Sequence, residues 1–154
     1  MRSYYQKLFG TARLSAACAI FLLAAGPALA AEDEALAPIH RFFDAFAKRD
    51  KAGMMAEIAE GAEITSERDG QLRRLTLDAL TDRIVAFEPD KKIAETISDP
   101  IIHHDGTLAV VWARYSLAVD GKPSHCGVDS FSLLKLQDRW RIVAIADNSR
   151  ENCS

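Results

Sequence analysis

Residues 108–146 read LAVVWARYSLAVDGKPSHCGVDSFSLLKLQDRWRIVAIA, and this stretch decides the fold. Two pairs of turn residues, Asp120-Gly121 and Gln137-Asp138, divide it into three segments rich in β-branched and large apolar residues. Such segments, joined by two-residue turns, are typical of antiparallel strands. The stretch therefore predicts a three-stranded meander over residues 108–119, 125–136 and 140–147.

The chain before this meander carries both helical and hairpin patterns. A run of apolar residues recurs at helical spacing after Pro38, which suits the first turn of a helix. Asp69-Gly70 is a strong hairpin signal, and Pro100 predicts a bulge or an edge in its strand. The expected elements are helices over residues 38–49, 50–61 and 76–87, hairpin strands over 62–67 and 71–75, and a strand over 93–103. This order predicts an α+β domain in which helices cover one face of a curved sheet.

The first thirty residues have the pattern of a cleaved leader. Three basic residues precede a short apolar run from Leu14 to Ala25, and Ala28-Leu29-Ala30 forms a cleavage site. The alternative is a membrane anchor, but this run is shorter than the roughly 20 residues that a spanning helix needs. We therefore expect residues 1–30 to be a signal peptide, residues 31–154 to be one domain, and the mature protein to be periplasmic or secreted.

Charge and composition exclude some partners of the mature chain. Its sixteen basic residues face 22 acidic ones, which gives a formal charge near −6. Such a charge argues against nucleic acid or an anionic membrane surface as a partner. No pair of histidines has metal-ligand spacing, there is no C-x-x-C motif, and nothing in the sequence indicates a cofactor.

Two cysteines, Cys126 and Cys153, remain after cleavage of the leader. An oxidising compartment favours a disulfide between them, because two is the smallest number that can pair. The alternative is a buried thiol at Cys126 and an unpaired one in the tail.

The two turns of the meander give a strand register and, with it, a candidate pocket. If Asp120 and Gly121 are the only loop residues, Trp112 pairs with Asp129 and Arg114 pairs with Gly127. One helix-covered face then carries an aromatic wall and three ionisable groups. Burying such groups is costly unless they pair or reach water, so their presence together on this face indicates a pocket. The predicted ligand-binding residues are Phe43, Trp112, Arg114, His125, Asp129 and Phe131.

Asp129 has two candidate partners within this group. His125 and Asp129 lie about 13 Å apart along an extended strand, too far for a direct hydrogen bond. Arg114 is the better partner for Asp129 and would keep its carboxylate ionised. The same group could equally be a structural ion pair at a wet rim.

The sequence resembles the nuclear transport factor 2-like superfamily, whose cone-shaped fold is shared with ketosteroid isomerase and the SnoaL-like cyclases. The resemblance runs from about Ala37 to Cys153 and is carried by FFDAF followed by Arg49-Asp50, by HCGVDSF after Asp120-Gly121, and by Trp140-Arg141-Ile142. More narrowly, the chain is similar to small exported proteins of the "putative lumazine-binding" type. The resemblance implies a curved antiparallel sheet with three helices over its concave face, but no single activity.

Three functions fit this fold. We expect a non-catalytic protein that binds a small, partly apolar ligand with a polar or anionic group. An isomerase, cyclase or dehydratase using Asp129 or His125 as acid or base is the first alternative, although the assumed register places a second donor, Tyr115, on the other face. A dimeric interaction module is the second. A homodimer is expected in any case, because the other face would expose an apolar surface that includes Val111, Tyr115 and Ile145.

Overall fold

The computed structural model describes residues 27–153, and for residues 27–33 it describes the backbone alone. Among these residues no helix is both long and apolar enough to span a membrane. The predicted signal peptide lies almost wholly outside the described residues, so its cleavage stays a prediction. The elements in chain order are α1 (Pro27–Lys48), α2 (Lys51–Met55), β1 (Ile58–Arg68), β2 (Gln71–Thr76), α3 (Leu77–Ala86), β3 (Ile93–Asp105), β4 (Leu108–Val119), β5 (Lys122–Leu136) and β6 (Arg139–Arg150).

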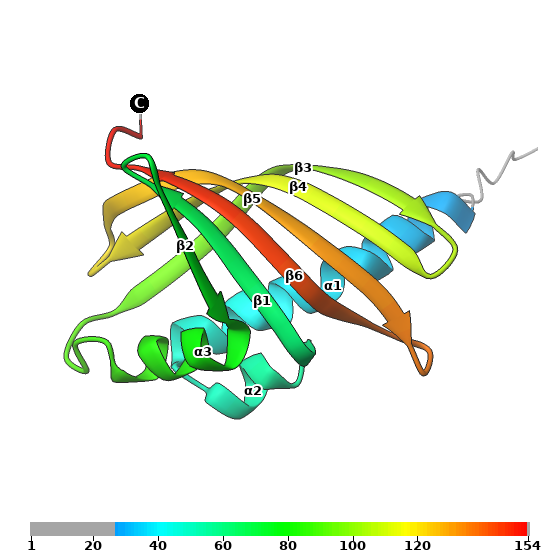
Figure 1. Cartoon of the computed structure of the whole chain (residues 1–154), viewed down its shortest axis with the longest axis horizontal. Helices are drawn as coiled ribbons and strands as arrows, with labels where there is room; N and C mark the ends of the chain where they lie inside the picture. Colours follow the sequence, from blue (N-terminus) through cyan, green and yellow to red (C-terminus); the bar gives the residue numbers. More distant parts are fainter. Residues whose placement is uncertain (1–26, 154) are drawn as a thin grey trace, which may run out of the picture.

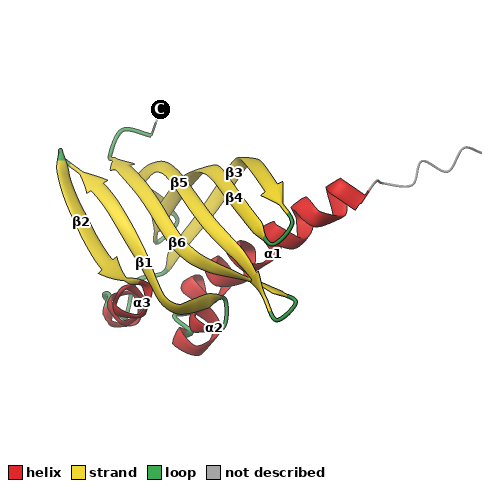
Figure 2. Ribbon diagram, turned by 45° about the vertical axis from the view of Figure 1, so that its right-hand side comes forward, coloured by secondary structure: helices red, strands yellow, loops and turns green. Residues whose placement is uncertain are grey.

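The strands form one curved sheet in the order β2-β1-β6-β5-β4-β3 (Figure 1). Neighbouring strands are antiparallel except β1 and β6, which are parallel. The three helices lie together on one side of this sheet (Figure 2). The α+β class and the helix-covered curved sheet expected from the sequence are confirmed.

The first helix does not begin where the sequence predicted. It starts at Pro27, and Pro38 lies inside it and is buried. A proline in a helix interior removes one hydrogen bond and costs about 3 kcal/mol, which is why a helix start was expected there. The alanine-rich segment before Pro38 has high helix propensity and continues the helix on its N-terminal side.

The buried face of α1 joins the helices to the sheet. Phe42, Phe43 and Phe46 are buried, and the Phe43 ring meets the Phe131 ring of β5 edge to face at 6.0 Å between centroids. Arg41, on the same helix, donates two hydrogen bonds of 2.9 and 2.8 Å to the buried carboxylate of Glu57. This bidentate pair holds α1 against the segment that leads into β1.

Arg49 ties the end of α1 to the loop after α3. Its guanidinium donates to the carbonyls of Ile84, Phe87, Glu88 and Lys91. The carbonyls of Ile84 and Glu88 also accept backbone hydrogen bonds, from the N–H groups of Phe87 and Lys91, so the guanidinium adds to the bonds that close this loop. The start of β3 is thereby held close to α1.

The turn at Asp120-Gly121 forms as predicted, but the register of β4 against β5 is shifted by one residue. Val119 pairs with Lys122 and Ala118 with Pro123, and then Leu117 pairs with His125. Ser124 is the extra residue of a β-bulge, and Pro123 beside it cannot donate to the strand ladder. A similar shift between Ser132 and Leu133 interrupts the pairing of β5 with β6.

This bulge corrects the predicted face of β4. Because side chains alternate along a strand, a shift of one residue moves every β4 side chain to the opposite face. Val111 and Tyr115 are buried on the helix-covered side, whereas Trp112 and Arg114 point outward and are exposed. The predicted placement of Trp112 and Arg114 in the pocket is wrong, and so is the outer apolar surface built on Val111, Tyr115 and Ile145.

The structure pairs Cys126 of β5 with Cys153 of the tail, with Cα atoms 5.7 Å apart. This separation is within the range of natural disulfides. The formation of this bond in an oxidising compartment stays a prediction.

Candidate functional site

A cavity of about 160 Å³ lies between the helices and the concave face of the sheet. Three phenylalanines of α1 (Phe42, Phe43, Phe46) form one wall, together with Leu80 and Ile84 of α3. Five strands supply the opposite wall: Ile64 and Arg68 (β1), Glu95 (β3), Leu117 (β4), His125, Asp129 and Phe131 (β5), Ile145 and Asp147 (β6). The cavity is therefore apolar on its helical side, and all the ionisable residues of its lining lie on its sheet side.

Two carboxyl groups from different strands meet in this cavity. Glu95 and Asp129 both line it, a hydrogen bond between them contributes to the pKa of each, and only 3% of Asp129 is exposed to solvent. Burial raises the pKa of Asp129 to about 7, helped by the negative charge of Asp147, while the hydrogen bond from Glu95 opposes the rise. Burial also raises the pKa of Glu95 well above its usual range, helped by the charges of Asp129 and Asp147. At neutral pH the pair therefore holds more protons than two exposed carboxyl groups would.

The buried oxygens of this acidic group are not all satisfied. Within the described residues, Oδ2 of Asp129 and Oδ1 of Asp147 are buried without a hydrogen-bond partner. A buried polar atom without a partner costs about 1–3 kcal/mol. A cavity that contains such atoms is suited to a ligand that donates hydrogen bonds.

His125 and Arg68 complete the polar wall. Burial and the positive charge of Arg68 lower the pKa of His125, against the opposing effect of Asp147. The pKa of Asp147 is raised by burial, although a hydrogen bond from Ser66 and the charge of Arg68 act against this. The imidazole is accordingly neutral at pH 7 and can either donate or accept a hydrogen bond.

Tyr115 stands beside His125, with ring centroids 5.9 Å apart, and its hydroxyl donates to the Asn148 carbonyl at 3.0 Å. The ring crosses Gly127, where an added Cβ would lie 2.8 Å from Cε1 of Tyr115. Gly127 is therefore required for this crossing. Burial raises the pKa of Tyr115 to about 12, so the phenol stays protonated.

The structure brings four of the six predicted ligand-binding residues into the cavity: Phe43, His125, Asp129 and Phe131. Trp112 and Arg114 lie on the outer face, so the predicted Arg114–Asp129 pair does not form. Ligand binding by the four remaining residues is still a prediction. Among the described residues, no group of three or more His, Cys, Asp or Glu side chains is arranged to hold a metal ion.

Sequence reasoning missed the partners of Asp129. Glu95 lies between Ile93 and Ile97 on one face of β3, and a carboxyl group at an apolar position was a signal that could have identified it. Asp147 lies two residues beyond Ile145 in β6 and therefore on the same face of that strand. Pro123-Ser124 was the corresponding signal for the bulge.

The sequence profile of one family, described as "Putative lumazine-binding", matches residues 30–146. The comparison with curated proteins gave no match.

Many solved structures share the fold. An NTF2-like protein of unknown function from Shewanella baltica is 20% identical, with a TM-score of 0.62, over 80% of this chain and 97% of that one. An NTF2-like protein with a cystatin-like fold from Novosphingobium aromaticivorans is 15% identical, with a TM-score of 0.66, over 82% and 86%. A structure from Streptomyces avermitilis, described as a "putative dehydratase" of the NTF2-like family, is 10% identical, with a TM-score of 0.63, over 80% and 98%. At these identities the likeness shows the NTF2-like fold alone. The profile match covers most of the chain, and the protein belongs to the family described as "Putative lumazine-binding".

Proposed function

We propose that this domain is an exported protein that binds a small, flat molecule in the cavity between α1 and the sheet. The observation that carries the proposal is Oδ2 of Asp129, a buried acceptor without a partner in an aromatic-walled cavity. A ligand N–H or O–H group would satisfy this oxygen. Phe43 and Phe131 would pack against the flat part of the ligand.

The exclusion of Arg114 from the cavity changes the expected ligand. Glu95, Asp129 and Asp147 make the inner wall acidic, so the buried part of the ligand is a hydrogen-bond donor rather than an anion. Lumazine, the compound in the family's description, is a flat heteroaromatic molecule with N–H donors and agrees with this chemistry. The open space between helices and sheet favours ligand binding over a module that only binds other proteins.

Acid–base catalysis is a second candidate function. It is favoured by the pKa of about 7 for Asp129, because a general base works best when its pKa is near the working pH. Neutral His125 in the same cavity could donate a hydrogen bond to a reacting oxygen. One structural neighbour is described as a "putative dehydratase", which is compatible with such chemistry.

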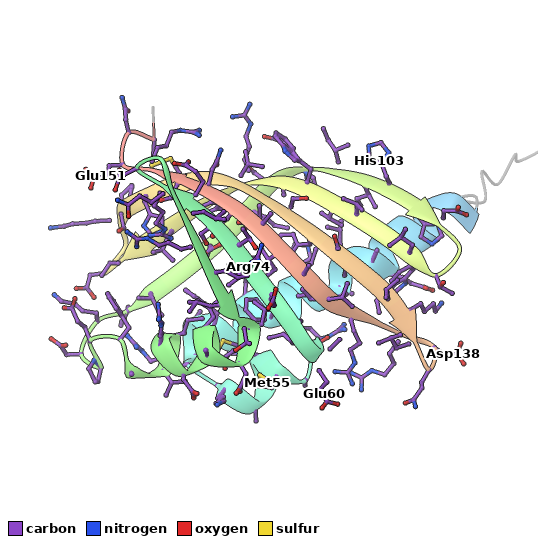
Figure 3. The ribbon with its side chains drawn as sticks, viewed as in Figure 1. Met55, Glu60, Arg74, His103, Asp138 and Glu151 are labelled. Carbon is purple, nitrogen blue, oxygen red and sulfur yellow. A yellow bond between two sulfur atoms is a disulfide. The ribbon has the colours of Figure 1, made fainter. Side chains whose placement is uncertain are left out.

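Lumazine binding to the wild-type protein, measured by isothermal titration calorimetry, tests the proposal. Asp129→Asn should weaken binding roughly 10- to 100-fold, because a hydrogen bond to a charged group contributes about 1.5–3 kcal/mol. Asp138→Asn is the matched control, since Asp138 lies at the tip of the β5–β6 hairpin away from the cavity (Figure 3). Equal affinity in the wild type and Asp129→Asn would contradict the site.

Native mass spectrometry separates the two candidate functions. A molecule that co-purifies with the exported protein and stays unchanged on long incubation supports binding alone. Its conversion into a second species by the wild type, but not by Asp129→Asn, would favour catalysis instead.

We also propose that the protein forms a dimer through the outer face of its sheet. Ile101, Leu108 and Trp112 are 53%, 47% and 38% exposed, and Ile101 pairs with Trp112 across β3 and β4. His103 projects from the same face (Figure 3). We expect light scattering at micromolar concentration to give a dimer mass, and Trp112→Glu to give a monomer mass. A monomeric wild type would contradict this surface.

A further inference from the structure

A second hollow, of about 460 Å³, adjoins the cavity on the side of the β1–β2 hairpin and α3. Its lining includes four arginines, Arg68 of β1, Arg73 and Arg74 of β2, and Arg83 of α3, and we name it the arginine groove. Ile64, Arg68, Leu80 and Asp147 line both the groove and the cavity. In Figures 1 and 2, α3 lies beneath the β1–β2 hairpin, so residues from separate elements converge here.

These arginines have few acidic partners. Arg74 approaches Glu63 at 4.0 Å across the hairpin. The positive charge of Arg68 lowers the pKa of the cavity carboxyls Glu95 and Asp147, against the larger effect of their burial. Within the described residues, neither Arg73 nor Arg83 forms an ion pair or a side-chain hydrogen bond. Asp147 is the one acidic residue in the lining of the groove. Like charges gathered with so few counter-charges repel one another, and a bound anion relieves this repulsion.

The position of the charges is unexpected in an acidic protein. The full chain has 22 acidic and 19 basic residues, yet four cations line one groove. Guanidinium groups recognise the oxygens of carboxylates and phosphates through paired hydrogen bonds. Arg68 stands at the boundary between this cationic groove and the acidic cavity.

We propose that the arginine groove binds an oxyanion, a carboxylate or a phosphate, that belongs to the ligand of the cavity. This inference rests on the proposed function. The ligand class is then a flat hydrogen-bond donor that carries an acidic group: the flat part lies against Phe43 and Asp129, and the acidic group lies between Arg73 and Arg83. Because the two sites recognise different groups, they also fix the orientation of the bound ligand.

The test uses inorganic phosphate and acetate as probes, in separate titrations at constant ionic strength, followed through the side-chain N–H signals of the arginines by NMR. The signals of Arg73 and Arg83 should shift, and the probe with the higher affinity assigns phosphate or carboxylate. The double variant Arg73→Gln/Arg83→Gln should bind that probe at least about tenfold more weakly, since it loses two charge-assisted contacts. Arg114→Gln, an exposed arginine on the outer face, is the matched control and should bind as the wild type does.

The outcomes separate this inference from the proposed function. An equal response of Arg114 and the groove arginines, or unchanged affinity in the double variant, would overturn the oxyanion site. Neutral lumazine should bind the double variant as it binds the wild type, because the groove does not contact the buried donor group. Phosphate or acetate binding without lumazine binding would support the groove and count against the proposed function of the cavity.

Discussion

Asp129→Asn is expected to raise the free energy of unfolding at pH 8 by up to about 4 kcal/mol. A carboxyl group whose pKa is 3.8 in the unfolded chain and about 7 in the folded one costs this amount when it is fully ionised, at 1.36 kcal/mol per pKa unit. Asparagine has nearly the same shape, carries no charge, and can donate its amide hydrogens to Glu95. The variant should therefore remove a penalty without opening a cavity.

The sign of the pH dependence follows from the direction of the shift. Between pH 4 and 7 the folded protein holds a proton at Asp129 that the unfolded chain has released, so stability falls as the pH rises through this range. The pKa values of Glu95 and Asp147 are also raised, so their ionisation acts in the same direction. The wild type should be more stable at pH 5 than at pH 8, and Asp129→Asn should reduce this difference.

Urea unfolding at a series of pH values from 5 to 8.5 measures the effect. Asp138→Asn is again the control, because its side chain lies at a hairpin tip and should change stability little at any pH (Figure 3). A loss of stability at pH 8 in Asp129→Asn, or a difference from the wild type that does not change with pH, would show that Asp129 is not held in an unfavourable buried state. A gain in stability together with a loss of ligand binding would show that the site is maintained at a cost to the fold.

Loss of the Cys126–Cys153 link is expected to have the second largest effect. The two residues are 27 positions apart, and the chain-entropy model gives about 3.5 kcal/mol for closing such a loop. Cys126 follows His125 of the cavity, and the tail beyond Arg150 has no strand of its own. Cys153→Ala should lower the free energy of unfolding, measured by urea unfolding, by about this amount.

Intact mass of protein exported by a bacterial host tests the bond and the export together. The mass should correspond to a chain that begins at Ala31 and lacks the two thiol hydrogens. Reductant should bring the wild type to the stability of Cys153→Ala and should leave the variant unchanged. Two free thiols in the denatured, unreduced protein would contradict the bond, and a full-length mass in the soluble exported fraction would contradict the leader.

Local patterns in the sequence were sufficient for most of the elements and for the class of fold. Asp69-Gly70 and Asp120-Gly121 form the expected hairpin turns, and Thr76 caps α3 by accepting a hydrogen bond from the Ala79 N–H at 3.1 Å. Pro100 lies at the predicted irregularity of β3. These features depend on the conformational preferences of a few adjacent residues, so they can be inferred without the rest of the chain.

The faces of the strands and the composition of the site depended on the tertiary structure. A single bulged residue, Ser124, exchanged the inner and outer faces of β4, because side chains alternate with a period of two. Pairing between strands distant in sequence then placed Glu95 and Asp147 beside Asp129, and packing of α3 under the hairpin placed Arg83 near Arg73. The sequence by itself determined most of the helices and strands, although not the start of α1 or the change from α2 to β1 at Ile58, and only the curvature and register of the assembled sheet decided which ionisable side chains share one buried space.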